Sequence, residues 1–140
     1  VSASFDGYDD DGVLDFAAGV QHARAAVVAG EITKLLAELA RTGPTEDELA
    51  KARRRHGWDM HTMFDSPEEL AGFYAAGLLF DRFELPEERT AKNAAVTRDD
   101  IRALADMLAQ PDRLNVLAVG LLDDGEDRRL EDIVKGYSLR

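Results

Sequence analysis

Apolar residues recur along this chain at two different spacings. Residues 1–5 and 13–20 mix apolar with small or polar residues in an extended pattern, and residues 114–121 (LNVLAVGL) are nearly all apolar. These patterns predict β-strands, the first two joined as a hairpin and the third buried in the centre of a sheet. Between about residues 23 and 108 the apolar residues instead recur every three or four positions, which predicts amphipathic helices.

Start and stop signals divide the helical region into segments. Gly43 and Pro44 end one helix, because glycine accepts left-handed angles and proline cannot extend a helix. Thr45 and Glu48 form a capping box that begins the next helix. The predicted helices are 23–41, 46–63, one from Pro67 through about Phe80, 86–95, one between the capping residue Thr97 and Pro111, and a last one after the acidic turn 123–127.

Smaller signals predict how these helices begin and pack. Ser66 and Glu69 are expected to form a second capping box. Gly30, Gly72 and Gly77 leave small surfaces where another element can approach closely. The residues predicted to face inward are Val28, Ile32, Leu35, Leu36 and Leu39; Leu49, Ala52, His56, Met60 and Met63; Leu70, Phe73, Tyr74, Gly77, Leu78 and Phe80; Ile101, Leu104, Ala105 and Leu108; and Leu130, Ile133 and Val134.

Together these elements predict an α+β fold. We expect a small, mainly antiparallel sheet of about three strands, with one face covered by roughly five helices. The length of 140 residues fits a single domain, 1–140. Because the chain begins without Met, we expect a fragment whose N-terminal part is missing. A sheet that has lost partner strands should expose an edge, which predicts self-association into a homo-oligomer.

Composition narrows the classes of partner. The chain has 17 basic and 28 acidic residues, for a net charge of −11. This charge disfavours nucleic acid, keeps a protein soluble and could attract basic peptides. The apolar runs fall short of a membrane span, and no signal peptide opens the chain, which favours a soluble, cytoplasmic protein. With no cysteine, the chain has neither disulfides nor thiolate metal ligands.

The three histidines do not match a zinc-binding pattern. His56 and His61 are five residues apart, about 140° around a helix. Zinc-binding pairs on a helix are three or four residues apart. His22 precedes another helix and has no acidic or imidazole companion nearby in the sequence. His56 lies on an apolar stripe and is interpreted as a core histidine with a hydrogen-bond partner.

Other catalytic patterns are also missing from the sequence. No serine lies in a nucleophile elbow, and Ser66 is used as a helix cap. No glycine-rich phosphate loop is present, and the tyrosines at 8, 74 and 137 are scattered. The turn 6–12 contains four aspartates, but Gly7 and Ala18 stand where a calcium loop needs Asp and Glu. We therefore predict no catalytic, metal or cofactor residue in this chain.

One basic cluster interrupts the acidic sequence. It consists of Lys51, Arg53, Arg54 and Arg55 on the predicted second helix. A solvated helix face is the preferred interpretation, and a binding site for an anion or a partner is the alternative.

The order of these motifs resembles the insulinase/pitrilysin-type zinc metallopeptidases, which include the mitochondrial processing peptidases. A strand with a Gly-containing turn (11–14) and a long helix precede Thr45-Glu46-Asp47-Glu48-Leu49-Ala50-Lys51-Ala52. That run is similar to the T-E-x-E-L-x-x-A-K run of the family, with Lys and Ala exchanged in order. Asp65-Ser66, the segment 95–101 and the predicted strand ending at Val119-Gly120 also fit.

The resemblance also has clear departures. The zinc motif of the family, His-x-x-Glu-His with a distant Glu, is absent from this sequence. The segment with an Arg and a Tyr that help to hold substrate, expected just before Val1, is absent too. The chain therefore resembles the C-terminal portion of the second, non-catalytic half, and no functional residue of the family carries over. The zinc of such an enzyme would belong to the other half.

Three functional hypotheses follow. The first is a non-catalytic domain that packs against the zinc-bearing half and helps to enclose the chamber for a peptide substrate. The second is an independent interaction module that uses the Lys51–Arg55 ridge or the aromatic helix 73–80. The third and weakest is a hydrolase in its own right. Whether the parent protein is an active enzyme stays uncertain from the sequence.

Overall fold

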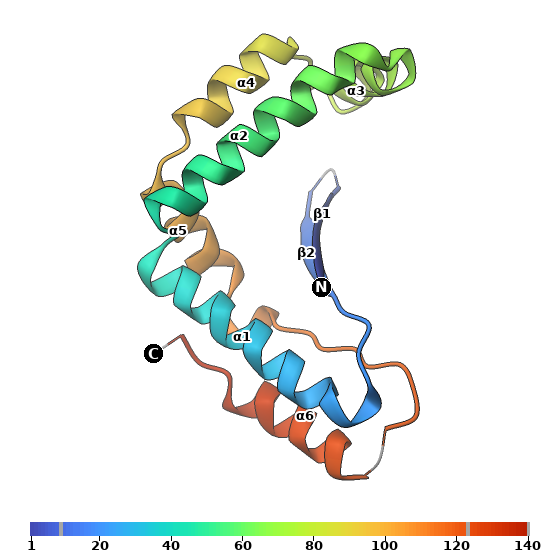
Figure 1. Cartoon of the computed structure of the whole chain (residues 1–140), viewed down its shortest axis with the longest axis vertical. Coiled ribbons are helices and arrows are strands. Elements are labelled where there is room, and N and C mark those ends of the chain that lie inside the picture. The colour runs from blue at the N-terminus through green and yellow to red at the C-terminus, as the bar shows by residue number, and fades with distance from the viewer. Residues whose placement is uncertain (9, 123, 140) are drawn as a thin grey trace. The chain divides into compact units, whose positions relative to one another are not determined.

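The chain is α+β, as the sequence predicts. The computed structural model describes residues 1–8, 10–122 and 124–139. Over these residues it contains six α-helices, three short 3₁₀ helices and a two-stranded antiparallel sheet (Figure 1). The elements in order are β1 (Ser2–Gly7), β2 (Gly12–Ala17), η1 (His22–Arg24), α1 (Ala25–Thr42), α2 (Glu46–Thr62), η2 (Met63–Asp65), α3 (Pro67–Leu79), α4 (Pro86–Ala95), α5 (Arg98–Leu108), η3 (Pro111–Arg113) and α6 (Asp124–Gly136).

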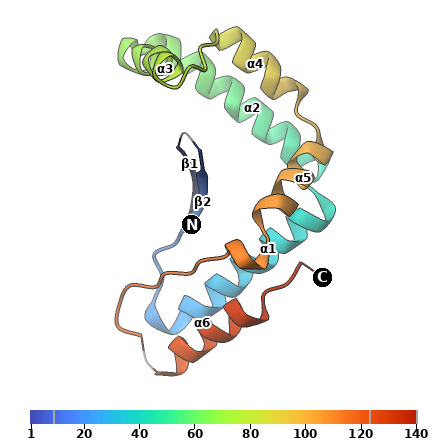
Figure 2. The ribbon, with the colours of Figure 1, turned by 180° about the vertical axis from the view of Figure 1, so that it is seen from behind.

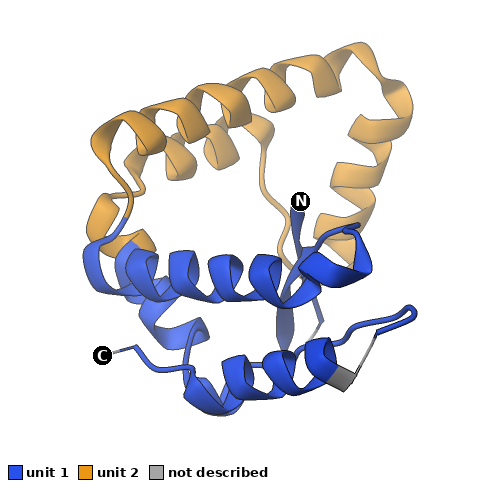
Figure 3. Cartoon of the chain, turned by 60° about the horizontal axis from the view of Figure 1, so that its bottom comes forward, with its two compact units in different colours: residues 1–43, 102–140 blue, residues 44–101 orange. Residues whose placement is uncertain are grey.

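The described residues form two compact units. Unit 1 contains residues 1–43 and 102–140, and unit 2 contains residues 44–101 (Figure 3). Unit 1 holds the hairpin, α1, α6 and the end of α5, whereas unit 2 holds α2, α3 and α4.

The predicted hairpin is confirmed in unit 1. β1 and β2 pair in antiparallel register from Ser2 opposite Ala17 to Gly7 opposite Gly12. The backbone N–H of Tyr8 donates to the carbonyl oxygen of Asp11 at 2.8 Å and closes the turn. Every residue of the two strands is exposed, on both faces of the hairpin, except Gly12, which is half-buried. The prediction that helices cover one face of the sheet is therefore wrong.

The predicted third strand is also wrong. Residues 114–119 have no regular secondary structure, and Gly120 is at a bend. The described sheet contains two strands rather than about three. A strand requires a second backbone edge to pair with, and an apolar sequence pattern supplies the side chains but not that edge. The segment 114–121 is instead a connection between η3 and α6.

Small residues let the helices of unit 1 pack closely. α1 and α6 lie side by side in both views (Figure 1, Figure 2). A Cβ added at Gly30 of α1 would lie 3.6 Å from Cδ1 of Ile133 on α6, so the expected close approach at Gly30 is confirmed. The buried core of this unit contains Ala40, Ala105 and Ala109, with Leu36, Leu39 and Leu139 packed against it.

The boundary after α1 has the predicted local geometry. Gly43 has φ 68°, a left-handed value that favours glycine, and its N–H donates to the carbonyl oxygen of Leu39 at 2.9 Å. In unit 2, the Thr45 hydroxyl accepts from the backbone N–H of Glu48 at 3.2 Å. The Glu48 carboxylate accepts in return from the Thr45 backbone N–H at 2.8 Å. The capping box that begins α2 is therefore confirmed.

Ser66 caps α3 in a simpler way than the sequence predicts. Its hydroxyl accepts from the N–H of Glu69 at 3.3 Å, and Pro67 occupies the first turn of the helix. The N–H of Ser66 donates to the carbonyl oxygen of Met63 at 3.1 Å. That bond satisfies the amide that the Glu69 side chain would bind in a capping box, so the cap is confirmed without its reciprocal half.

Burial confirms only part of the inward faces predicted for α2 and α3. On the predicted face of α2, Leu49, Met60 and Met63 are buried, His56 is half-buried and Ala52 is exposed. On that of α3, Leu70, Phe73, Tyr74 and Gly77 are half-buried, whereas Leu78 and Phe80 are 68% and 44% exposed. Leu35, Leu104 and Val134, also predicted to face inward, are exposed. A spacing of three or four residues predicts which side chains share a helix face, but not whether a neighbour covers that face.

Candidate functional site

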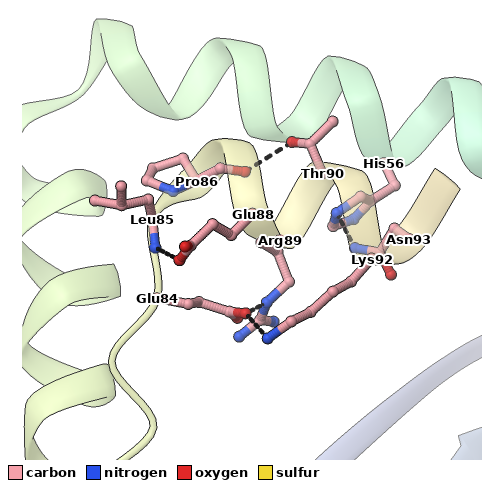
Figure 4. Close-up of polar contacts among 9 residues, drawn as sticks. All are labelled: His56, Glu84, Leu85, Pro86, Glu88, Arg89, Thr90, Lys92 and Asn93. Carbon is pink, nitrogen blue, oxygen red and sulfur yellow. Dashed lines mark hydrogen bonds and ion pairs between the residues drawn. The ribbon is translucent and has the colours of Figure 1, made fainter. Parts of the chain in front are cut away.

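The histidines are not gathered into a metal site. His22 is exposed in η1 of unit 1, while His56 and His61 are on α2 of unit 2. His61 is exposed, and His56 is half-buried with its Nε2 hydrogen-bonded to the side-chain amide of Asn93 on α4 (Figure 4). Among the described residues, no group of three or more histidines and carboxylates could hold a metal ion. His56 thus has the hydrogen-bond partner expected of a core histidine.

A charged cluster ties the start of α4 to the connection before it. The Glu84 side chain is 10% exposed and accepts from Nζ of Lys92 at 2.7 Å and from Nε of Arg89 (Figure 4). The Lys92 ammonium, and then the Arg89 guanidinium, hold the pKa of the Glu84 carboxyl below its ordinary value. Next in sequence, the Leu85 N–H donates to the Glu88 carboxylate at 2.8 Å. Two basic side chains thus bind one carboxylate, and these contacts are well suited to fixing the position at which α4 begins.

Aromatic rings extend this cluster along α3. Phe73 and Tyr74 meet edge to face at 5.5 Å between ring centroids, and Tyr74 stacks on Phe83 at 5.7 Å. The Arg89 guanidinium carbon lies 5.7 Å from the Phe73 ring centroid. A Cβ added at Gly77 would lie 3.3 Å from Cα of Phe83, so the expected close approach there is confirmed, whereas nothing approaches Gly72. These contacts stabilise the α3–α4 connection within unit 2.

The basic cluster 51–55 is mostly a solvated helix face. All four of its side chains are exposed. Arg53 donates to the carbonyl oxygen of Val96, and Nε of Arg55 lies 4.0 Å from a carboxylate oxygen of Asp59. An exposed pair at that distance contributes little to stability. The exposure of all four side chains favours the interpretation as a solvated face.

Unit 1 contains a groove of about 390 Å³ beside α6. One wall is the connection after η3, through Val116, Leu117, Ala118 and Leu122, and the other is α6. The α6 wall contains Asp127, Leu130, Glu131, Val134 and Lys135. Apolar side chains therefore line most of the groove, with charged groups along the helix.

The charged groups of this groove are not equivalent. The Lys135 ammonium donates to the Glu131 carboxylate at 2.7 Å, and this bond lowers the pKa of Glu131 and raises that of Lys135. The Asp127 carboxylate makes no hydrogen bond or ion pair with any of the described residues. Asp127 is therefore the groove carboxylate that is available to a cation from outside.

The connection that forms the other wall has an unpaired backbone. We call residues 114–121 the apolar connection. Among the described residues, the backbone groups of residues 115–121 take part in no backbone–backbone hydrogen bond. Leu117, Val119 and Leu121 are 88%, 91% and 93% exposed. Alternate large apolar side chains thus face solvent beside a backbone that lacks partners, which is rare in a folded protein.

The sequence pattern of the apolar connection predicts a strand, but no sequence pattern predicts the groove. The apolar stripe of α6 predicts a helix and does not indicate which segment lies along it. The turn 6–12 is described except for Asp9, which lies outside the described residues. Within it the N–H of Gly12 donates to the Asp11 carboxylate at 2.8 Å. This contact belongs to an ordinary aspartate turn.

Comparison with known proteins identifies no relative. No family model matches this chain, and neither the curated proteins nor the solved structures contain a match. Among the described residues, none of the helices has both the length and the apolar character needed to cross a membrane.

Proposed function

We propose that this chain is a non-catalytic domain that acts by packing against another polypeptide. The observation that carries this proposal is the imbalance between exposed and buried apolar side chains. Among the described residues eight hydrophobic side chains are buried, whereas 23 large hydrophobic side chains are exposed. Extensive exposed apolar surface marks sites of protein contact. The apolar connection contributes four of these exposed side chains.

The kind of partner is inferred from the order of the motifs. The capping box at Thr45, the helices before and after it and the hairpin strand with its Gly-containing turn support a domain similar to the second half of an insulinase/pitrilysin-type zinc metallopeptidase. In such a protein the partner is the zinc-bearing half, in the same chain or in a separate subunit. This domain would form part of the wall of the peptide chamber, and its charge of −11 would favour basic segments of the substrate.

No zinc chemistry is assigned to the residues of this chain. The described histidines and carboxylates form no metal-binding group, and His56 is occupied by Asn93. The chain would contribute shape, apolar contact area and charge, while the other half would supply the metal and the general base.

The complete protein provides the test of this function. We expect its gene to encode, in the same chain or a neighbouring one, a domain with His-x-x-Glu-His. We expect that Leu117→Asp in this complete protein lowers zinc-dependent cleavage of a quenched fluorescent peptide while bound zinc is unchanged. Val27→Asp is the matched control, because Val27 is 63% exposed on α1 outside the groove. A complete protein without any zinc-bearing domain would contradict the proposal.

A second function, an independent interaction module, is favoured by the end of α3. Leu78 and Leu79 are 68% and 78% exposed, and Phe80 and Phe83 are also exposed. Exposed apolar side chains of this kind in unit 2 would bind a partner without any peptidase. If this function is correct, the 140 residues alone are a stable monomer that binds a protein, and Leu79→Asp abolishes the binding. The homo-oligomer that the sequence predicts through an exposed sheet edge would contradict this second function, and sedimentation of the same sample tests it.

A further inference from the structure

We infer that the apolar connection, 114–121, together with the groove along α6, binds an extended polypeptide strand that carries a basic side chain. This inference holds whether or not the chain belongs to a peptidase, because it rests only on residues of unit 1.

The backbone of the apolar connection can accept a strand. Residues 115–121 leave their N–H and C=O groups without backbone partners among the described residues. Leu114, at the start of the connection, already has extended angles, φ −75° and ψ 121°. Strand addition uses such a row of unpaired groups for affinity and the neighbouring side-chain pockets for specificity. The exposed side chains at 117, 119 and 121 have the two-residue spacing of a strand.

The groove supplies the side-chain pockets. Val116, Leu117, Ala118 and Leu122 line the groove opposite Leu130 and Val134 of α6. A strand added beside the connection would place alternate side chains over α6, as a helix covers one face of a sheet. Apolar side chains at those alternate positions would be removed from water by the groove.

The charged residues of the groove favour one kind of binding partner over another. The Asp127 carboxylate lines the groove from α6 and has no partner among the described residues, whereas Glu131 is already paired with Lys135. Residues 114–122 contain no basic side chain that could meet Asp127. A second copy would present the same neutral segment and would add another −11 of charge. A strand from a different polypeptide, with apolar residues at alternate positions and one lysine or arginine, fits both the groove and the charge.

The test measures the anisotropy of a fluorescein-labelled peptide of alternating threonine and valine, with a central lysine and about nine residues. We expect this peptide to bind to the 140-residue protein. The same peptide with alternate backbone nitrogens methylated should not bind, because it lacks donors for strand pairing. Equal binding of the methylated peptide, or no binding of the unmethylated one, would overturn the inference.

Two matched variants on α6 test the charge. Asp127→Asn should weaken binding of the lysine peptide about two- to five-fold, the effect of losing an exposed ion pair. Asp132→Asn makes the same change of charge on the same helix, outside the groove lining, and should leave the affinity unchanged. A peptide with central glutamine should bind both variants equally. Equal loss in the two variants would contradict a specific contact with Asp127.

Sedimentation of the same protein without peptide tests whether a second copy of this chain binds to the connection instead. We expect a monomer at the concentrations used for the binding measurement. A stable dimer that the lysine peptide fails to dissociate, and that Val119→Pro converts to a monomer, would assign the connection to a second copy instead. That result would overturn the inferred partner and leave the proposed peptidase-like function untouched.

Discussion

The carboxylate of Glu126 on α6 accepts a hydrogen bond from the backbone N–H of Ala26 on α1, although the two residues are 100 positions apart in the sequence. The donor and acceptor atoms are 3.1 Å apart, and Glu126 is 2% exposed. The first N–H groups of a helix have no partner within it, and the N-terminus carries partial positive charge. Glu126 therefore caps α1 from another element. Arg129 also donates to this carboxylate at 2.6 Å.

Removing this cap should destabilise unit 1. We expect Glu126→Ala to lower the free energy of unfolding by about 1.5–3 kcal/mol, because it removes hydrogen bonds to a buried charged acceptor. Urea unfolding monitored by far-UV circular dichroism measures the change. Glu131→Ala is the control, since the exposed Glu131 pairs only at the surface, and it should cost less than about 0.5 kcal/mol. Equal effects of the two variants would contradict a capping role.

Tyr137 provides a second contact within unit 1. Its hydroxyl donates to the carbonyl oxygen of Ala109 at 2.9 Å. Tyr137→Phe should lower the free energy of unfolding by about 0.5–1.5 kcal/mol, the net value of one hydrogen bond. Tyr8→Phe is the matched control because the Tyr8 side chain is 61% exposed and should have no measurable effect. A neutral Tyr137→Phe variant would show that the bond does not contribute.

Tyr137 should also make stability depend on alkaline pH. Burial raises the pKa of the Tyr137 hydroxyl above its ordinary value of 10.0. The unfolded chain then loses this proton at a lower pH than the folded chain. The contribution of Tyr137 to the free energy of unfolding is therefore present below about pH 10 and is lost as the pH rises through the folded pKa. Ultraviolet titration of the wild type and of Tyr137→Phe measures it, and identical titration of tyrosine in folded and urea-unfolded protein would contradict it.

The capping box of α2 predicts a local effect in unit 2. Thr45→Ala removes the hydroxyl that accepts from the N–H of Glu48, and should cost about 1 kcal/mol. Thr45→Ser keeps the hydroxyl and should restore most of the loss. Hydrogen exchange of the α2 amides, followed by mass spectrometry of peptides from this helix, measures the change. If the serine variant exchanged as fast as the alanine variant, the cap would not be the cause.

The two local caps of unit 2 should also respond to acid. Hydrogen bonds from Thr45 lower the pKa of Glu48 from 4.5, and those from Thr97 lower the pKa of Asp100 from 3.8. The folded pKa values lie below the unfolded ones. The two caps therefore contribute to the free energy of unfolding above about pH 4.5, and this contribution is lost as the pH falls through the folded pKa values. Carboxyl carbon shifts in an NMR titration measure both groups. Midpoints at or above the ordinary values would contradict the hydrogen bonds.

Features encoded within a few residues could be predicted from the sequence. The caps at Thr45 and Thr97, the left-handed Gly43 and the hairpin all depend on neighbours in the chain. The helix 86–95 has the predicted bounds for the same reason, since Pro86 fixes its first turn. Local rules are sufficient where the hydrogen-bond partner is three or four residues away.

Features that depend on distant partners were not predictable in this way. The residues 114–121 carry a strand pattern, but no second strand lies beside them among the described residues. The contact of Glu126 with Ala26 joins elements 100 residues apart and has no local signature. The groove depends on the same kind of contact, because Leu130 of α6 must approach Val116. The spacing of apolar residues shows which side chains of a segment can be buried together. They become buried only where a second element packs against them.

Hydrogen exchange at residues 115–121 tests the central claim most directly, namely that the backbone of the apolar connection is unpaired in the protein alone and pairs with a strand of another polypeptide. In the 140-residue protein alone, these amides should exchange at the rate of an unfolded peptide, while those of α1 are protected. On addition of the lysine-containing strand peptide, alternate amides of the connection should become protected. Protection of residues 115–121 in the protein alone, or none with saturating peptide, would contradict the account.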